Sequence, residues 1–276
     1  MRISRDISIM IELIIVITLA VLNFGRIVGF LDYIFGFLFA ESEYSDIALL
    51  TLTNDGYIDI TMNCIKSLEK LRKPGFPKIV VYAIGEKARK EFSRYLAYDS
   101  MCGILASAEQ ALSARQTFRK GNWGSLTSLK FLMIHKYLHR YKFVCMTDGD
   151  IVFLSPEIFT TLESYIGDND MLIMNDTMDD KCSDNLCSGF MFIRRNETTL
   201  RIFDPSNVEK RQKEVGFDDQ VYMNEVKDQI RYKMLPLNEF PNGRYFYNNS
   251  DIEPMLVHFN WTRDKLQTMD IFGMRF

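Results

Sequence analysis

The fold is decided by the stretch KFVCMTDGDIV, residues 142–152. Its first part, KFVCMT (142–147), is a short apolar run that leads directly into Asp148, Gly149 and Asp150. A continuous apolar run of this length predicts a buried strand. In an open α/β sheet, the side chains that follow such a strand face the ligand crevice. The stretch therefore predicts two carboxylates that face a ligand at the edge of a sheet.

Asp148 and Asp150 have the chemistry of a cation site. Two carboxylates at this spacing can hold a divalent cation, and oxygen ligands suit Mg²⁺ or Mn²⁺. Such a cation can neutralise a diphosphate. Gly149, between them, lets a phosphate or a metal approach the backbone. The structural alternative is a simple Asp-Gly turn that binds nothing.

His258 is the candidate for a third metal ligand. Of the three histidines, His135 and His139 fall on a predicted helix, where exposure to solvent explains them. His258 instead follows the apolar run Met255–Val257, and an imidazole at that point can complete a metal site. The alternative is a buried histidine that is satisfied by hydrogen bonds.

Before this stretch, the chain alternates strands and helices. The pattern predicts strands over Asp46–Thr53 and Lys78–Ile84, and helices over Tyr57–Leu71 and Glu86–Tyr98. This order predicts parallel strands joined by right-handed crossovers.

A further helix is predicted over Trp123–Tyr141, immediately before the acidic stretch. Beyond it, the pattern predicts strands over Met171–Met174 and Ser188–Ile193 and a helix over Phe217–Val226, while the chain from Met234 on is aromatic and rich in turns. The expected fold class is therefore α/β, with an open, mostly parallel sheet flanked by helices.

Composition limits the possible functions. The 276 residues suit one α/β domain plus a short extra segment, and 33 Lys and Arg against 36 Asp and Glu give no sign of a nucleic-acid binder. Five cysteines are too few for a disulfide scaffold, and four ligands at zinc spacing are missing. Cys182 and Cys187 flank a loop and could form a disulfide in an oxidising compartment.

The N-terminus predicts a membrane anchor. Residues 7–24 are nearly all apolar apart from Glu12, close to the ~20 that a spanning helix needs. Arg2 and Arg5 precede this segment and acidic residues follow it, which favours a single-pass type II protein with a cytoplasmic N-terminus. We expect residues 1–41 to be anchor and stem, and residues 42–276 to be the catalytic domain. The alternatives are a cleaved signal peptide or a buried core helix.

Several motifs carry a resemblance to one family. In chain order they are Thr51-Leu52-Thr53-Asn54-Asp55-Gly56-Tyr57, Asn63, Ser67-Leu68, Lys130, Asp148-Gly149-Asp150, Ser188-Gly189-Phe190, Asp219-Gln220, Phe240-Pro241-Asn242-Gly243 and His258-Phe259-Asn260-Trp261. With them the chain resembles the nucleotide-diphospho-sugar transferases, a family that includes plant-type retaining α-xylosyl- and α-galactosyltransferases. That resemblance implies a GT-A-like, Rossmann-type fold.

The resemblance also implies roles for individual residues. The nucleotide base and ribose would be lined by Thr53, Asn54, Asp55 and Tyr57. The diphosphate or the donor sugar would meet Lys130.

The same resemblance assigns the metal and the donor sugar. The cation, Mn²⁺ or Mg²⁺, would be held by Asp148, Asp150 and His258, with Asp148 also able to contact the ribose. The donor-sugar pocket would be shaped by Ser188 and Gly189. The family usually has Asn where Cys187 stands, which leaves the donor sugar open.

The implied reaction is transfer of a sugar from a nucleotide sugar, with UDP as the expected nucleotide, to a glycan or glycoprotein acceptor with retention. Asp219 and Gln220 would lie beside the anomeric carbon as the catalytic residues. Retention can proceed by front-face attack or through an enzyme nucleophile, for which Asp219 is the candidate. In a eukaryotic cell such an enzyme is expected in a Golgi-like compartment.

Two other functions remain open at this stage. A haloacid-dehalogenase-like phosphatase would share the pattern of Met146–Val152, although its acidic strand comes first in the domain. A non-catalytic protein that binds nucleotide sugars or glycans would share the whole fold.

Two further features concern the surface. Asn-x-Ser/Thr sequons occur at Asn175, Asn196, Asn248 and Asn260, and we do not expect modification of Asn260 because it lies in the candidate site. The aromatic residues 245–247 are candidates for an acceptor platform, with core packing as the alternative.

Overall fold

The structure is a computed structural model, and it describes residues 46–73, 76–77, 79–95, 102–104, 110–178, 185–249 and 251–276. The predicted membrane anchor and Cys182 lie outside these residues. Among the helices of the described part, none is long and apolar enough to cross a bilayer.

The strands predicted from the apolar runs all form, at nearly the predicted bounds. In chain order the strands are β1 (Ile47–Asn54), β2 (Ile79–Ile84), β3 (Cys102–Ile104), β4 (Phe143–Thr147), β5 (Ile151–Phe153), β6 (Met171–Asn175), β7 (Leu186–Arg194), β8 (Tyr232–Met234) and β9 (Leu256–His258). Within the described part of the chain, seven of them form one sheet with the order β3-β2-β1-β4-β7-β6-β8.

This sheet is mostly parallel, as predicted. β1 pairs in parallel with β2 and with β4, β2 with β3, and β6 with β8. β7 runs antiparallel to both of its neighbours, β4 and β6. As a result, the start of β7 lies at the same edge of the sheet as the ends of β1, β4 and β6.

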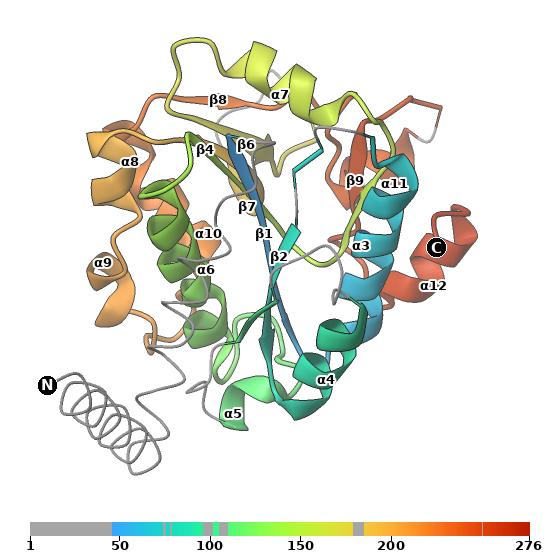
Figure 1. Ribbon diagram of the computed structural model, residues 1–276, viewed down its shortest axis with the longest axis horizontal. Coiled ribbons are helices and arrows are strands. Elements are labelled where there is room, and N and C mark those ends of the chain that lie inside the picture. Colours follow the sequence, from blue (N-terminus) through green and yellow to red (C-terminus); the bar gives the residue numbers. More distant parts are fainter. Residues whose placement is uncertain are drawn as a thin grey trace, which may run out of the picture.

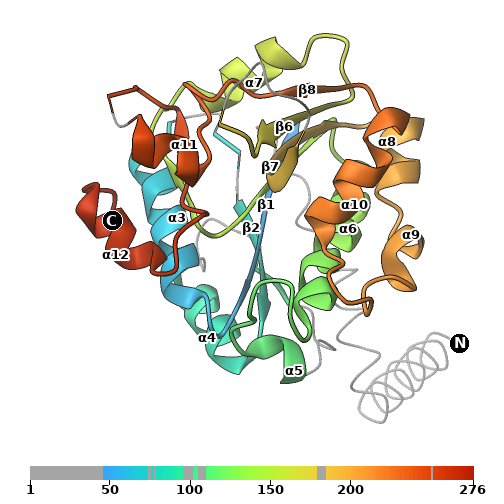
Figure 2. The same cartoon turned by 180° about the vertical axis from the view of Figure 1, so that it is seen from behind.

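Helices cover both faces of the sheet (Figures 1 and 2). They are α3 (Ile58–Leu71), α4 (Glu86–Tyr95), α5 (Gln110–Ser113), α6 (Trp123–Leu138), α7 (Ile158–Ile166), α8 (Glu197–Ile202), α9 (Ser206–Glu209), α10 (Asp219–Val226), α11 (Gly243–Asn248) and α12 (Lys265–Ile271), with the short 3-10 helix η1 (Lys227–Gln229). In Figure 1, α6, α8, α9 and α10 lie on one side of the sheet, and α3, α4, α11 and α12 lie on the other.

The sheet separates two hydrophobic cores, because successive residues of a strand point to opposite faces. In β1, Ile47 and Leu49 pack into the core under α3, α4 and α7. Ala48 and Leu50 pack into the core under α6 and α10. This strand is buried on both faces, which explains why its sequence is an apolar run without alternation.

A second, two-stranded sheet joins the C-terminal part of the chain to the acidic stretch. β5, directly after Asp150, pairs antiparallel with β9, so that Ile151 lies opposite His258. A third hydrophobic cluster lies beside this pair, where Phe246 and Phe259 pack with the C-terminal helix. This pairing fixes where His258 lies relative to Asp150.

The sequence pattern missed the short elements. The region from Met234 on, predicted as turn-rich, contains α11, β9 and α12. Elements of three to seven residues carry too little periodicity to be recognised. The side chains of Asn242 and Asp264 accept hydrogen bonds from the first turns of α11 and α12. Asn and Asp are preferred at helix N-caps, so these two residues could have indicated where the helices begin.

Candidate active site

A cavity of about 810 Å³ opens where β1, β4 and β6 end and β7 begins. Its lining includes Asn54 from the end of β1, Asp148 after β4, Asp176 after β6 and Cys187 from the start of β7. Parallel strands present their carboxyl ends at one edge, and the reversed β7 adds its amino end there. The topology thus brings together residues that are more than 130 positions apart in the chain.

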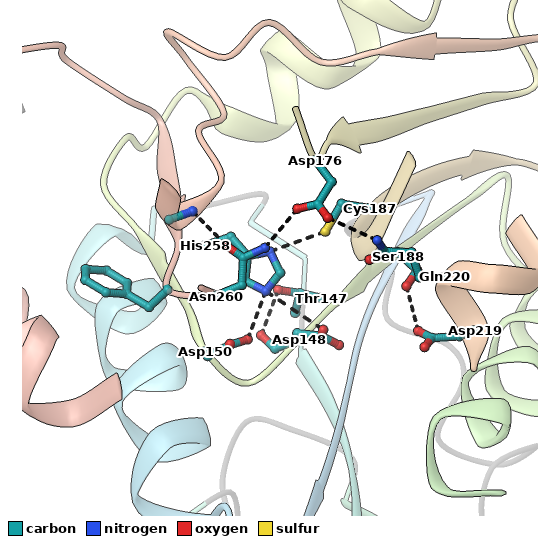
Figure 3. Close-up of polar contacts among 12 residues, drawn as sticks. Thr147, Asp148, Asp150, Asp176, Cys187, Ser188, Asp219, Gln220, His258 and Asn260 are labelled. Carbon is teal, nitrogen blue, oxygen red and sulfur yellow. Dashed lines mark hydrogen bonds and ion pairs between the residues drawn. The ribbon is translucent and has the colours of Figure 1, made fainter. Parts of the chain in front are cut away.

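Asp148, Asp150 and His258 form a compact cluster in this cavity (Figure 3). The Nε2 of His258 lies 3.2 Å from Oδ1 of Asp150 and 4.0 Å from Oδ2 of Asp148. One potential ligand atom from each residue lies within 4.8 Å of the other two. The three predicted ligands are therefore brought to the spacing that a single cation requires.

The imidazole of His258 has the environment of a metal ligand. Its Nε2 is buried, and its contact with Asp150 at 3.2 Å is an ion pair without the geometry of a good hydrogen bond. Its Nδ1 lies 3.5 Å from Sγ of Cys187. A histidine that ligates a metal through one nitrogen is usually held by a partner on the other. A buried ring nitrogen whose neighbours are two carboxylates therefore fits a divalent cation.

Lys130 is buried between two carboxylates on the other side of Asp148. Its Nζ lies 2.5 Å from Oδ1 of Asp148 and 2.6 Å from Oδ2 of Asp219. The hydroxyl of Ser188 also donates to that oxygen of Asp219, at 2.8 Å. Burial alone would lower the pKa of Lys130, but the charges of Asp148 and Asp219 raise it above its usual value. The ammonium group is therefore charged at neutral pH.

The two acids of the motif have opposite pKa shifts. Burial raises the pKa of Asp148, although Lys130 acts in the other direction. Burial would also raise the pKa of Asp150, but Lys265 and His258 hold it well below its usual range. Asp150 is therefore the firmly ionised carboxylate of the cluster.

Sequence reasoning missed Lys265, at the start of α12. Its Nζ lies 2.5 Å from Oδ2 of Asp150 and donates to the backbone oxygen of Phe259 at 3.0 Å. No periodicity marks this residue, since α12 spans only seven positions. The sequence feature that could have indicated Lys265 is its position seven residues after His258. The pairing of β9 with β5 brings this segment close to the acidic stretch.

Three of the four residues assigned to the nucleotide, Thr53, Asn54 and Tyr57, line the cavity. Asn54 donates through its amide nitrogen to the backbone oxygens of Leu112 and Ala114, at 2.9 Å each. These bonds attach the end of β1 to the segment that leads to α6.

Asp55 is the exception among the predicted residues. Its carboxylate accepts a hydrogen bond from the backbone nitrogen of Ala88 in the first turn of α4, at 2.8 Å. Asp55 is not among the residues that line the cavity. An aspartate at the start of a helix satisfies a free backbone donor and favours the helix dipole. The structure thus gives Asp55 a capping role away from the candidate site.

Gln220 and Asp219, the predicted catalytic pair, both line the cavity from the first turn of α10. Gln220 donates through Nε2 to Oδ2 of Asp176, at 3.1 Å. The other oxygen of Asp176 accepts from Asn260 and Trp261, at 3.3 and 3.0 Å. Sequence reasoning missed Asp176. Its position directly after the strand β6 is the feature that could have indicated a residue at the ligand edge of the sheet.

The glycines of the site allow close packing. A Cβ at Gly189 would lie 2.2 Å from Cε1 of His258, so only glycine leaves room for the imidazole. A Cβ at Gly149 would lie 2.3 Å from Oγ1 of Thr61. A side chain at position 149 would thus collide with Thr61 of α3, while Gly149 itself lines the cavity.

The aromatic run at residues 245–247 packs mainly into the core. Phe246 is buried, and its ring lies 4.9 Å from that of Phe272. Tyr247 stacks on the same Phe272 ring at 5.7 Å and donates through its hydroxyl to the backbone oxygen of Asn260. For these two residues the structure supports core packing rather than an acceptor platform.

Comparison with known proteins agrees with this geometry. The model of the nucleotide-diphospho-sugar transferase family matches residues 76–270. The UDP-galactose:fucoside alpha-3-galactosyltransferase of Dictyostelium discoideum is 24% identical over 267 residues, covering 77% of this chain and 40% of that protein. The chain therefore spans less than half the length of this relative.

Two solved structures share the fold. The glycosyltransferase GlyE of Streptococcus pneumoniae TIGR4 matches with a TM-score of 0.55 and 17% identity, covering 79% of this chain and 55% of that one. The galactosyltransferase LgtC, solved with donor and acceptor sugar analogs, matches with a TM-score of 0.54 and 13% identity, covering 83% and 96%. At this identity the likeness shows the fold alone, which is that of the GT-A glycosyltransferases.

The phosphatase alternative is excluded by the family match, and the acidic strand β4 follows β1, β2 and β3 rather than opening the domain. The family match covers well over half of the chain, and the sheet order and the acidic cluster agree with it. This chain belongs to the nucleotide-diphospho-sugar transferase family of glycosyltransferases.

Proposed function

We propose that the protein transfers a hexose from a UDP-sugar, galactose being the first candidate, to a glycan or glycoprotein acceptor, with a divalent cation as cofactor. The observation that carries this proposal is the position of the Asp148–Asp150–His258 cluster beside the Lys130–Asp219 pair in one cavity.

The cluster suits Mn²⁺ or Mg²⁺. Two carboxylates supply hard oxygen ligands, and the imidazole of His258 favours Mn²⁺ over Mg²⁺. When bound, the cation would supply positive charge at the departing diphosphate. Asp150 is suited to hold it because it is ionised at every physiological pH.

Lys130 supplies a second positive charge from the chain itself. It is fixed by Asp148 and Asp219 before any donor binds, so little reorganisation is needed during the reaction. Fixed charges in a site shielded from water stabilise a developing charge far better than charges in water do. We assign Lys130 to the diphosphate or the donor sugar.

Asp219 and Gln220 would lie beside the anomeric carbon. The oxocarbenium-like carbon of glycosyl transfer is stabilised by a nearby carboxylate or amide oxygen. One oxygen of Asp219 is already bound by both Lys130 and Ser188, which lowers its nucleophilicity. This favours a charge-stabilising role for Asp219 and retention by front-face attack.

The donor and acceptor follow from the relative's name alone. The Dictyostelium protein is a galactosyltransferase that uses UDP-galactose and a fucoside. UDP-galactose and fucosides are therefore the first compounds to test. We also propose that residues 1–41 anchor the enzyme as a type II membrane protein in a Golgi-like compartment, which brings it to glycan acceptors.

The test is donor turnover by the full-length chain in detergent. The protein is incubated with UDP- and GDP-sugars, with and without Mn²⁺, and release of the nucleoside diphosphate is measured. We expect Mn²⁺-dependent release of UDP from one UDP-sugar. Tight nucleotide binding without release, in the presence of a fucoside panel, would favour the non-catalytic binding protein. Absence of both would overturn the proposed function.

A further inference from the structure

Trp261 is an exposed aromatic residue in the wall of the cavity. The residue is 58% exposed, although most large apolar residues in the described part of the chain are buried. It follows Asn260 and lies three residues after His258. The interactions of the donor, as proposed above, do not use it.

The backbone of Trp261 is strained. Its φ is +58°, a left-handed conformation that bulky residues rarely adopt. Such outliers persist only where the surroundings impose them, and they gather at ligand sites. Contacts of the neighbouring residues must therefore hold Trp261 in this conformation.

The preceding residue, Asn260, is held in place by its own hydrogen bonds. The side chain of Asn260 accepts a hydrogen bond from the backbone nitrogen of Gly243 at 2.6 Å, and its backbone oxygen accepts one from Tyr247 at 2.9 Å. A Cβ at Gly243 would lie 2.2 Å from that oxygen. Asn260 is thus fixed against α11, and the turn at Trp261 is set by this packing.

The indole is also held in one orientation. Its Nε1 donates to Oδ1 of Asp176 at 3.0 Å, and the guanidinium carbon of Arg244 lies 5.6 Å from the centre of the ring. Arg244 covers one face of the ring, while Trp261 as a whole stays more than half exposed. A rigid, flat, apolar surface is thereby presented at the cavity.

Asp176 connects this surface to the candidate catalytic residues. Its second oxygen accepts from Gln220, the neighbour of Asp219 in α10. A ring lying on the indole would therefore have polar groups of Asp176 and Gln220 within reach of its hydroxyls. Sugar rings combine an apolar C–H face with a polar rim, and this arrangement matches both.

We propose that Trp261 is the stacking surface of an acceptor subsite, on which the C–H face of a sugar ring lies while Asp176 and Gln220 face its hydroxyls. This inference rests on the proposed function, because it assigns the acceptor of that reaction. Trp261 would determine which sugars are accepted, and it is not a catalytic residue.

The test is saturation-transfer NMR of methyl fucoside, methyl galactoside and methyl xyloside with the full-length protein, UDP and Mg²⁺. We expect at least one glycoside to receive saturation on the C–H protons of one ring face. W261F keeps a flat ring and should keep most of this signal. W261L has an apolar side chain that is not flat, and it should weaken binding by about threefold to tenfold.

Three results would overturn the inference. One is equal binding by W261L and W261F, since Trp261 would then only fill space. Another is no signal from any glycoside with the wild-type protein. The last is loss of UDP affinity in W261L, measured by calorimetry, which would place Trp261 on the donor side.

Failure of the proposed function is a separate result. If the wild-type protein releases UDP from a UDP-sugar but W261F and W261L bind the glycosides equally well, only the assignment of the acceptor subsite is wrong. If the wild-type protein neither binds UDP nor turns over a donor, the proposed function itself fails.

Discussion

The imidazole of His258 lies directly against Gly189, so closely that a Cβ at position 189 would come within 2.2 Å of Cε1. The two residues belong to different sheets, β9 and β7. Their contact lets a histidine near the C-terminus reach the two carboxylates that follow β4. The absence of a side chain at Gly189 is therefore a condition for the metal cluster.

Gly189→Ala should displace His258 and weaken Mn²⁺ binding by about 10-fold to 100-fold, the usual effect of disturbing a ligand's support. It should also lower the free energy of unfolding by about 1–3 kcal/mol, because the core is overpacked. Calorimetric Mn²⁺ titration and chemical unfolding measure the two effects. Gly124→Ala is the matched control, because its Cβ would meet the backbone oxygen of Phe217 at 2.6 Å, away from His258. Unchanged Mn²⁺ affinity in Gly189→Ala would contradict this explanation.

Lys265→Met should destabilise the metal-free protein more than the Mn²⁺-bound protein. Lys265 and Asp150 are both mostly buried, with side chains 19% and 11% exposed, so the loss of this ion pair, which leaves Asp150 with His258 alone, costs about 3 kcal/mol. A bound cation would neutralise Asp150 and reduce this cost. Chemical unfolding with and without Mn²⁺ gives the difference. Lys73→Met, which breaks the exposed Lys73–Glu157 pair, should show no dependence on Mn²⁺. Equal destabilisation of Lys265→Met in both conditions would argue against a cation at Asp150.

Mn²⁺ binding should strengthen as pH rises. Burial alone would lower the pKa of His258, but the charge of Asp150 raises it well above its usual value, so the metal-free imidazole is protonated at neutral pH. Its contribution to stability is full below about pH 6.5 and is lost as pH rises through the folded pKa. A metal requires the neutral imidazole, so binding releases a proton.

The apparent Kd for Mn²⁺ should therefore fall about tenfold per pH unit between about pH 6 and 8. Calorimetry in buffers of different ionisation enthalpy counts the protons released. His258→Gln should bind Mn²⁺ more weakly and with a much flatter pH dependence. A pH-independent Kd in the wild-type protein would show that His258 is not a ligand.

The sequons give a test of the proposed membrane topology. Asn175 is fully buried, Asn196 caps α8 and donates to Asp170, and Asn260 lies in the cavity. Asn248 is the exposed one, in the last turn of α11. If the catalytic domain is lumenal, one glycan should be found by mass spectrometry on Asn248 and be lost in Asn248→Gln. Protein from a glycosylating cell without any glycan would contradict the type II topology.

Sequence reasoning succeeded where apolar runs are long. The strands β1 and β4 are buried on both faces, so their sequences are continuous apolar runs that could be recognised. The cavity lies where these two strands end. Lys130, Asp148 and Asp219 were assigned to one site by the resemblance to the family rather than by periodicity, and all three line the cavity.

The contacts made by short elements could not be predicted. His258 reaches Asp150 through the three-residue pairing of β5 with β9, which has no periodic signal. Lys265 depends on a helix of seven residues. Asp55 fits the motif of the nucleotide site, yet its carboxylate caps α4, because a nearby free backbone nitrogen competes for it.

The measurement that tests the central claim most directly is UDP release from UDP-galactose by the wild-type protein and Asp150→Asn, each with and without Mn²⁺. The substitution keeps the shape of the side chain and removes its charge, and Asp251→Asn, at an exposed carboxylate outside the cavity, controls for the exchange itself. We predict Mn²⁺-dependent release by the wild-type protein and by the control, reduced about 100-fold or more in Asp150→Asn. Release that needs neither Mn²⁺ nor the charge of Asp150 would contradict the assignment of the cluster as the metal centre of the enzyme.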